Sequence, residues 1–176
     1  MQAQRSVPSR RELAVRIAII SDTHLSSPSE TLLHVFDRYL LEAEMLLHLG
    51  DVTGEETLAL FMTHPRFFGV SGNMDPQNVR SILPFSRTVR IEGVTIGMAH
   101  GWGMGPDPAS RLADIFHDQA DLVCFGHTHR RCHRVSAQGL MLINPGSLSL
   151  PRDDRPGFAW LHLHRGGPPQ VEWQDL

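Results

Sequence analysis

The sequence predicts an α/β fold in which two mixed β-sheets stack face to face and helices flank them on the outside. Three observations lead to this prediction. Short apolar runs and amphipathic segments alternate in the first half of the chain, which is typical of parallel βαβ units. Pairs of strand-like segments joined by turn residues dominate the second half and indicate β-hairpins. The chain has 176 residues, of which 41% are hydrophobic, and this is enough to bury the core of one domain.

The first half of the chain contains three predicted strands and two predicted helices. Residues 15–20 are β-branched and almost continuously apolar, as in a strand covered on both faces, and residues 45–49 and 67–70 give the next strands. A capping box at residues 27–30, with proline at the first helical position, begins one helix. Residues 55–61 form a short helix with acidic residues at its positive end. The core-facing residues expected from the first helix are Leu32, Leu33, Phe36 and Leu40.

The sequence of the second half of the chain predicts β-hairpins and one further helix. Glu92-Gly93 is a hairpin signal, because it separates two strand-like segments. Asp107-Pro108 begins a helix, since aspartate favours the capping position and proline the first turn. The residues expected to face inward from this helix are Leu112, Ile115 and Phe116. The strands expected in this half span residues 88–91, 94–98, 122–125, 132–135, 140–143, 157–164 and 171–173.

Composition narrows the class of protein. The formal net charge of −3 gives no electrostatic case for binding a nucleic-acid polymer or a membrane surface. No apolar run approaches the roughly 18 to 20 residues of a membrane span, and the N-terminus lacks the apolar core of a signal peptide, so we expect a cytoplasmic protein. Cys124 and Cys132 are too few for a disulfide framework. Residues 1–13 are expected to form a flexible arm, and residues 14–176 a single domain.

The most informative stretch is Gly126-His127-Thr128-His129, which follows an apolar run. Side chains two residues apart in extended chain point to the same side, so both imidazoles can reach one cavity. The preceding glycine would let the backbone turn tightly. Imidazole is the commonest neutral metal ligand, and the pair therefore indicates a metal site. Taken alone, the pair also fits solvated or hydrogen-bonded histidines.

Further polar residues follow the other predicted strands and strengthen the metal interpretation. Ligands in open α/β sheets bind at the carboxyl ends of strands, so these residues should converge. Seven ligands are too many for one tetrahedral ion but suit two ions that share a bridging carboxylate. The set lacks thiolate, which favours Mn²⁺, Fe, Zn²⁺ or Co²⁺ over Ca²⁺. The remaining histidines, His48 among them, are interpreted as surface or satisfied core residues. The seven candidate ligands are Asp22, His24, Asp51, Asn73, His100, His127 and His129.

Five short motifs, in this order, resemble those of the calcineurin-like metallophosphoesterases. The stretch at residues 144–147 and the short length look like the small bacterial and archaeal phosphodiesterase branch of that family. The resemblance implies a four-layer α-β-β-α metallophosphoesterase sandwich, which agrees with the fold predicted from the strand pattern. The motifs are Asp22-x-His24, Gly50-Asp51, Gly72-Asn73-x-Asp75, His100-Gly101 and Gly126-His127-x-His129.

The resemblance also implies a role for each candidate ligand. Asp22, His24 and His129 would hold a first ion, and Asn73, His100 and His127 a second, while Asp51 would bridge the two. Mn²⁺ is the expected metal, with Fe, Zn²⁺, Co²⁺ or Ni²⁺ as alternatives. A hydroxide bridging the metals would attack phosphorus and hydrolyse a P–O bond, so the catalytic residues would be Asp51, Asn73 and His100. Asp75 would orient a ligand.

Two positions depart from the fullest form of the family pattern. Many relatives have histidines where Met74 and Trp102 stand, and neither side chain can protonate a leaving group. The general acid is therefore unassigned, and substrates with good leaving groups are favoured. Met74 and Trp102 form either a wall for an aromatic leaving group or ordinary loop packing. Ser147 either caps a turn or contacts substrate, and Arg152 is a candidate substrate contact.

The predicted function is that of a metal-dependent phosphoesterase, more specifically a phosphodiesterase. A monoesterase and a 2′,3′-cyclic nucleotide diesterase are alternatives within the enzymes. The alternative from another class is a non-catalytic metal-binding interaction scaffold resembling the retromer subunit of the same fold. The expected partner is a small phosphoester, with nucleotide-like compounds among the candidates, and neither a membrane nor a nucleic-acid polymer is expected. The C-terminal strands could also pair between chains in a homo-oligomer.

Overall fold

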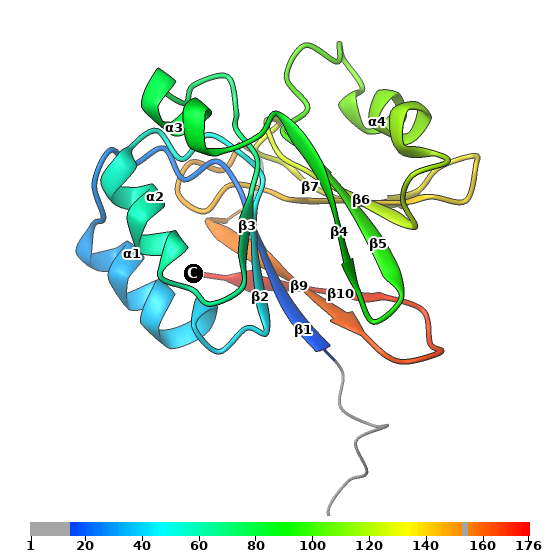
Figure 1. The fold of residues 1–176 in the computed structure, drawn as a ribbon, viewed down its shortest axis with the longest axis horizontal. Helices are drawn as coiled ribbons and strands as arrows, with labels where there is room; N and C mark the ends of the chain where they lie inside the picture. Colours follow the sequence, from blue (N-terminus) through cyan, green and yellow to red (C-terminus); the bar gives the residue numbers. More distant parts are fainter. Residues whose placement is uncertain (1–14, 153–154) are drawn as a thin grey trace, which may run out of the picture.

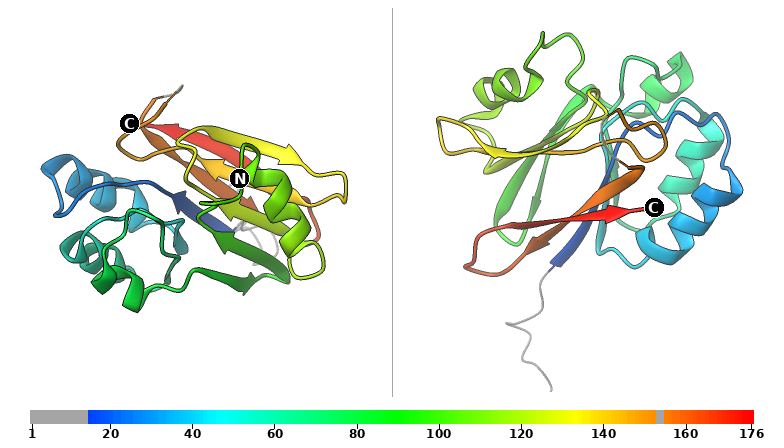
Figure 2. Two further views of the ribbon diagram at one scale, coloured as in Figure 1. Left: turned by 90° about the horizontal axis from the view of Figure 1, so that it is seen from above. Right: turned by 180° about the vertical axis from the view of Figure 1, so that it is seen from behind.

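Two five-stranded sheets form the centre of the protein (Figure 1). The computed structural model describes residues 15–152 and 155–176, and the arm predicted for residues 1–13 lies outside these ranges. The helices α1, α2 and α3 lie on one side of the stacked sheets and α4 lies on the other, as the views in Figure 2 agree. The predicted α/β class, with stacked mixed sheets and helices outside, is confirmed.

The first sheet has the strand order β10-β9-β1-β2-β3. The three strands from the first half of the chain are parallel, because helices connect them. The two C-terminal strands pair antiparallel with each other and add to the sheet beside β1. The strands are β1 (Val15–Ile20), β2 (Met45–His48), β3 (Phe67–Gly69), β9 (Gly157–Leu163) and β10 (Gln170–Asp175).

The second sheet has the strand order β4-β5-β6-β8-β7. Its three inner strands are parallel, and a hairpin partner lies antiparallel at each edge. The hairpin expected at Glu92-Gly93 and the hairpin expected from the strands at residues 132–135 and 140–143 are both present. The strands are β4 (Ser86–Ile91), β5 (Val94–Ala99), β6 (Leu122–Phe125), β7 (Arg131–Val135) and β8 (Met141–Pro145).

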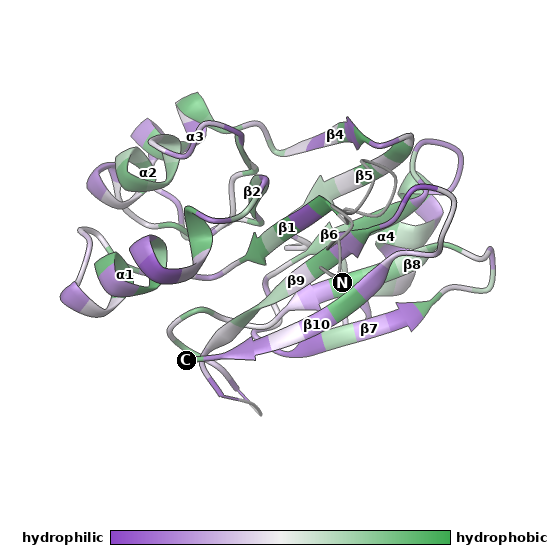
Figure 3. Ribbon diagram, turned by 90° about the horizontal axis from the view of Figure 1, so that it is seen from below, coloured by the Kyte–Doolittle hydropathy of each residue, from purple (hydrophilic) through white to green (hydrophobic). Residues whose placement is uncertain are grey.

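The helices are short, and none in the described ranges is long and apolar enough to cross a membrane. They are α1 (Glu30–Val35), α2 (Glu55–Met62), α3 (Gln77–Ile82) and α4 (Pro108–Phe116), and α1 continues as the π-helical segment η1 (Phe36–Leu40). Helices α1 and α2 carry both hydrophobic and hydrophilic residues (Figure 3), as expected where one face packs on a sheet.

Three details of the helices differ from the sequence-based expectation. The capping residue of α1 is Ser29, whose hydroxyl accepts a hydrogen bond from the Leu32 amide at 3.1 Å, so the helix begins after Pro28 rather than with it. In the resulting register Leu33 is 42% exposed, and in α4 Ile115 is 48% exposed, although both were expected to face inward. Helix α3 was not predicted, because only Val79 of its six residues is buried and no apolar periodicity marks it.

Three apolar clusters hold the layers together. The first lies between the sheets and includes Ile17, Leu47 and Ile143. The second packs α1, η1, α2 and α3 against the outer face of the first sheet, with Phe61 among its buried members. The third packs α4 against the outer face of the second sheet around Phe116. The order of layers is therefore helices, sheet, sheet, helix.

The neighbouring leucines of α1 give a test of this packing. We expect Leu32→Ala to lower the free energy of unfolding by about 2–5 kcal/mol, because it leaves a cavity in the helix-to-sheet cluster. The matched variant Leu33→Ala should change it by less than about 0.5 kcal/mol, since the side chain faces solvent. Urea denaturation of both variants measures the difference, and equal losses would contradict the described helix register.

Candidate metal centre

All seven predicted ligands lie on loops that directly follow strands. Three of these strands, β1, β2 and β3, belong to the first sheet, and two, β5 and β6, belong to the second. Because the strands in each set run parallel, their carboxyl ends meet where the two sheets adjoin. The residues contributed are Asp22 and His24 after β1, Asp51 after β2, Asn73 after β3, His100 after β5, and His127 and His129 after β6.

The backbone at these loops has an uncommon conformation. Positive φ angles occur at five of the predicted ligands, which are Asp22 (53°), His24 (48°), Asp51 (57°), His127 (70°) and His129 (57°). Only a few per cent of non-glycine residues adopt this left-handed region, at a cost on the order of 1–3 kcal/mol each. Such strain is typical of functional sites, where the surrounding fold fixes a conformation that the side chain needs.

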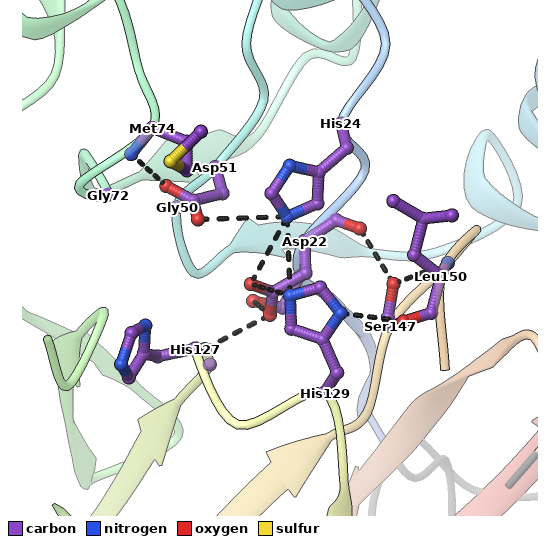
Figure 4. A network of polar contacts seen from close by, with 12 residues as sticks. Asp22, His24, Gly50, Asp51, Gly72, Met74, His127, His129, Ser147 and Leu150 are labelled. Carbon is purple, nitrogen blue, oxygen red and sulfur yellow. Dashed lines mark hydrogen bonds and ion pairs between the residues drawn. The ribbon is translucent and has the colours of Figure 1, made fainter. Parts of the chain in front are cut away.

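His127 and His129 differ from the sequence-based expectation in their geometry. Both lie in the left-handed region rather than in extended chain, so they do not point to one side of a strand. The His127 ring lies 5.2 Å from the His100 ring, whereas the His129 ring lies 5.0 Å from the His24 ring, measured between centroids. The two imidazoles therefore lie at opposite parts of the centre (Figure 4).

One group of ligand atoms surrounds the carboxylate of Asp22. The Oδ1 atom of Asp22 lies 3.2 Å from Nε2 of His129 and 3.8 Å from Nε2 of His24. The two histidine Nε2 atoms are 3.3 Å apart. This trio is the set expected to hold the first ion, and its spacing suits a shared cation (Figure 4).

A second group includes both carboxylates and His100. Nε2 of His100 lies 3.2 Å from Oδ2 of Asp51 and 4.0 Å from Oδ1 of Asp22. Oδ2 of Asp51 also lies 3.7 Å from Nε2 of His24. The Asp51 carboxylate thus lies between the two groups, which is the position that a bridging ligand requires.

Asn73 and His127 border the second group. Asn73 lines the same pocket as His100, and His127 packs edge to face against the His100 ring. His127 belongs to neither of the two close groups of candidate ligand atoms found in the described ranges. The structure therefore brings five of the seven candidates into tight clusters and places the other two beside them.

Several buried polar atoms fit a cation at this place. Buried polar groups are normally hydrogen-bonded, and leaving one without a partner costs about 1–3 kcal/mol. Oδ1 of Asp22, Oδ1 of Asn73 and Nε2 of His100 are buried and make no hydrogen bond of acceptable geometry, although Asp22 and His100 have oppositely charged groups 3.2–4.0 Å away. All three are donor atoms that divalent transition metals accept. The residues present therefore suit a bound metal.

The electrostatics of the centre favour positive charge. Burial alone would raise the pKa of Asp22, but the imidazoles of His129 and His24 lower it below its ordinary value. Burial likewise opposes ionisation of Asp51, whose pKa is lowered chiefly by His100. The pKa of His100 is raised, because the two carboxylates outweigh the effect of its burial. Carboxylates that favour a proton on His100 would equally favour a metal cation in exchange for that proton.

Hydrogen bonds on the far side of each ligand fix its orientation. Oδ2 of Asp22 accepts from the Ser21 hydroxyl at 2.6 Å and from the His127 amide at 3.1 Å, which leaves Oδ1 for the centre. Nδ1 of His100 donates to the Leu49 carbonyl at 2.7 Å, so its Nε2 faces the carboxylates. Such partners select the tautomer and hold the ring in place.

Asp75 joins two of the loops, as expected of a residue that supports a ligand. Its Oδ2 accepts hydrogen bonds from the amides of Asp51 at 3.1 Å and Gly72 at 2.7 Å. Its Oδ1 accepts from the Thr53 amide at 2.8 Å. The carboxylate is buried, and through these bonds it holds the loop of Asp51 against the loop of Asn73.

Two motif glycines are required by close approach rather than by a turn. A Cβ atom on Gly126 would lie 2.0 Å from Oγ of Ser21, and one on Gly72 would lie 2.1 Å from Oδ1 of Asp51. The tight turn expected here is present, because the Thr128 amide donates to the Gly126 carbonyl at 2.8 Å, but the positive φ of the turn belongs to His127 rather than to Gly126. Both glycines let loops pack directly on the two carboxylates.

The remaining candidates take different positions. Ser147 is buried, and its hydroxyl donates to the Asp22 carbonyl at 2.7 Å and accepts from the Leu150 amide at 2.8 Å, so it joins two loops and caps a turn. Met74 and Trp102 are 59% and 54% exposed. Arg152 is exposed, and its amide donates to the His129 carbonyl at 3.2 Å.

His48 is a satisfied core histidine, one of the two positions expected for it from the sequence, and it also supports the centre. It is completely buried, and burial lowers its pKa to about 4, so the ring is neutral at pH 7. Nε2 lies 2.8 Å from the Thr23 hydroxyl, and Nδ1 accepts from the Gly50 amide at 3.1 Å. These contacts tie the loops that carry Asp22 and Asp51. Its position two residues before Gly50, at the end of an apolar strand, is the only signal in the sequence.

Comparisons with known proteins agree with this geometry. Residues 15–166 match the model of the calcineurin-like phosphoesterase superfamily domain. A probable metallophosphoesterase of Methanothermobacter thermautotrophicus is 33% identical over 149 residues, which cover 84% of this chain and 85% of the relative. The solution structure of Thermotoga maritima protein TM1076 is 37% identical, with a TM-score of 0.68 and coverage of 92% of this chain and 99% of that chain.

A further structural neighbour shares the fold. Vacuolar Protein Sorting 29 from Cryptosporidium parvum superposes with a TM-score of 0.73 at 22% identity, over 93% of this chain and 98% of that chain. The family match spans all five sequence motifs, and the structure brings the residues of those motifs to one end of the sandwich. On this evidence, the chain belongs to the calcineurin-like phosphoesterase superfamily.

Proposed function

We propose that this protein is a phosphodiesterase that uses two divalent metal ions, with Mn²⁺ as the expected metal. The observation that carries the proposal is the position of Asp51, whose Oδ2 faces His100 on one side and His24 on the other. A single carboxylate oxygen between two groups of ligands suits a pair of ions about 3.5–4 Å apart, as two-metal hydrolases require.

The proposed ligand sets follow the two groups. Asp22, His24 and His129 would hold one ion, and Asn73, His100 and His127 the other, with Asp51 shared. Two divalent ions bound there would supply the charge that lowers the pKa of a water molecule and neutralises the phosphate oxygens.

The residues of the chain would position the reacting groups. The Met74 amide donates to Oδ1 of Asp51 at 2.7 Å, which directs Oδ2 toward the centre. His100 is held by the Leu49 carbonyl, and its burial excludes water from one side of the centre. In the reaction, a water oxygen forms a bond to phosphorus, the ester P–O bond breaks and an alkoxide leaves, and the proton that the water loses balances the proton that the alkoxide takes up.

The leaving group has no evident proton donor at the two positions where many relatives carry histidine. Met74 has no acidic proton, and the indole of Trp102 does not ionise in the accessible pH range. An alkoxide leaves poorly without protonation, so we propose that the enzyme favours esters of acidic alcohols.

A non-catalytic scaffold is the second candidate function. The observations that favour it are the lack of a proton donor at Met74 and Trp102 and the shared fold with Vacuolar Protein Sorting 29. On this hypothesis metal would be structural or absent, and a surface of the domain would bind partner proteins.

Metal removal and reconstitution test both candidates. The protein is stripped with a chelator, reloaded with Mn²⁺ and assayed on bis-p-nitrophenyl phosphate beside p-nitrophenyl phosphate, with bound metal counted by mass spectrometry. We expect about two ions per chain and faster turnover of the diester, because two ions can stabilise both the attacking and leaving oxygens. Bound metal without turnover of either ester would support the scaffold, and a single bound ion would contradict the shared role of Asp51.

Asp51→Asn tests the bridging carboxylate. The variant keeps an oxygen for the Met74 amide but removes the negative charge between the two groups. We expect diesterase activity to fall by at least about 100-fold while the circular dichroism spectrum is retained. Asp118→Asn, which changes an exposed carboxylate, is the matched control. Near-normal turnover by the Asp51 variant would refute the assigned role.

Asp75→Asn tests the support of the Asp51 loop. The side-chain NH₂ group of asparagine would face backbone N–H groups that donate to the carboxylate in the native protein. We expect Mn²⁺ affinity or kcat/KM to fall by about 10- to 100-fold, the usual effect of removing a partner that orients a ligand. Asp37→Asn, on the exposed side of η1, should change neither quantity. Unchanged metal affinity and turnover in the Asp75 variant would show that the contact is dispensable.

A further inference from the structure

Two exposed aromatic side chains lie at one pocket beside the metal centre. Among the described residues, Phe85 and Trp102 are the phenylalanine, tyrosine or tryptophan side chains that are largely exposed, at 57% and 54%. Single exposed apolar residues are ordinary, but two exposed rings at one pocket need an explanation. The pocket has a volume of about 260 Å³ and is lined by Ser71, Gly72, Asn73, Arg80, Phe85, His100 and Trp102.

The register of the β4–β5 hairpin brings Phe85 and Trp102 to the same pocket. Ser86, the first residue of β4, pairs with Ala99, the last residue of β5. Phe85 and His100 therefore emerge from the same end of the hairpin, and Trp102 follows two residues later. A ring held between Phe85 and Trp102 would thus lie directly beside a proposed metal ligand.

Arg80 adds charge to the same pocket. Its guanidinium donates to the Asn73 carbonyl, and this bond fixes it next to the loop of another proposed ligand. Within the described ranges, Arg80 forms no ion pair with a carboxylate. The remaining N–H groups of the guanidinium are suited to bind phosphate oxygens.

We infer that this pocket binds an aromatic ring of the substrate between Phe85 and Trp102, while Arg80 contacts its phosphate. The substrate class is therefore an aromatic phosphoester, and an aryl ester, whose phenol is an acidic alcohol, fits the missing proton donor better than a nucleotide derivative with a sugar hydroxyl as its leaving group. The inference rests on the proposed function, because it assumes that the phosphate lies at the metal centre. Met74 is not among the residues that line the pocket, so the aromatic site is formed with Phe85 rather than with Met74.

The size and chemistry of the pocket support a single ring system. Its volume is slightly below the roughly 300–1,000 Å³ of pockets that enclose drug-sized ligands, so it suits one base or aryl group rather than a longer oligomer. Stacking on aromatic side chains tolerates different rings, because every base has a π-face. A site of this kind binds flat aromatic ligands more tightly than aliphatic ones, but it does not distinguish one aromatic ring from another.

Calorimetric titration of the Mn²⁺-loaded protein tests the inference without relying on turnover. The ligands are adenosine 5′-monophosphate and ribose 5-phosphate, which differ by the base, and phenyl phosphate and methyl phosphate, which differ by the ring. We expect each aromatic ligand to bind at least about tenfold more tightly than its aliphatic partner. A preference confined to the nucleotide would identify a nucleoside ester, whereas a preference in both pairs would identify aromatic esters in general.

Variants assign the preference to the two rings. Phe85→Ala and Trp102→Ala should each weaken the aromatic ligands by about tenfold and leave the aliphatic ones unchanged. Ile82→Ala is the matched control, since Ile82 is 50% exposed and does not line the pocket. Arg80→Gln should weaken the binding of all four ligands about equally, and Arg90→Gln, at an exposed position of β4, should weaken the binding of none.

The outcomes separate this inference from the proposed function. Equal affinity for aromatic and aliphatic ligands, equal losses for both classes in the two alanine variants, or no binding of any ligand would overturn the inference, even if the diester is hydrolysed. An aromatic preference that depends on Phe85 and Trp102, in a protein that hydrolyses no ester, would refute the enzymatic proposal and leave the ring-binding site in place.

Discussion

The burial of two carboxylates side by side is the constraint on which the rest of the structure depends. Asp22 and Asp51 are 0% and 2% exposed, and ionised carboxylates are costly to remove from water unless positive charge or hydrogen bonds compensate. Imidazoles from three further positions, His24, His100 and His129, provide that environment. The arrangement that stabilises the two buried carboxylates also favours the binding of cations.

Holding this arrangement requires a rigid frame. The ligand loops follow strands of both sheets, and each strand is anchored in the apolar cluster between them. That anchoring offsets the cost of left-handed backbone at five ligands, which isolated loops would relax. Asp75, Ser147 and His48 then join the loops to one another, so the site is fixed by hydrogen bonds as well as by packing.

Much of the fold and site could be predicted from the sequence, because apolar strand patterns end directly before polar motifs and parallel strands bring those ends together. Other features depend on tertiary packing that local patterns do not encode. The outward position of Leu33 follows from where α1 begins, and the split of His127 from His129 follows from left-handed backbone. The position of Phe85 and Trp102 at one pocket depends on the register of a hairpin, which turn residues alone do not specify.

The distance along the chain between the ligands has a consequence for how the protein acquires metal. His24 and His129 are 105 residues apart in sequence, yet their Nε2 atoms are 3.3 Å apart. Contacts of such long range form late, because the intervening chain must first be ordered. In an incomplete chain on the ribosome, the ligand atoms would lie far apart in space. Metal would therefore bind only after the chain has folded, and its binding would stabilise the folded state relative to partly folded forms.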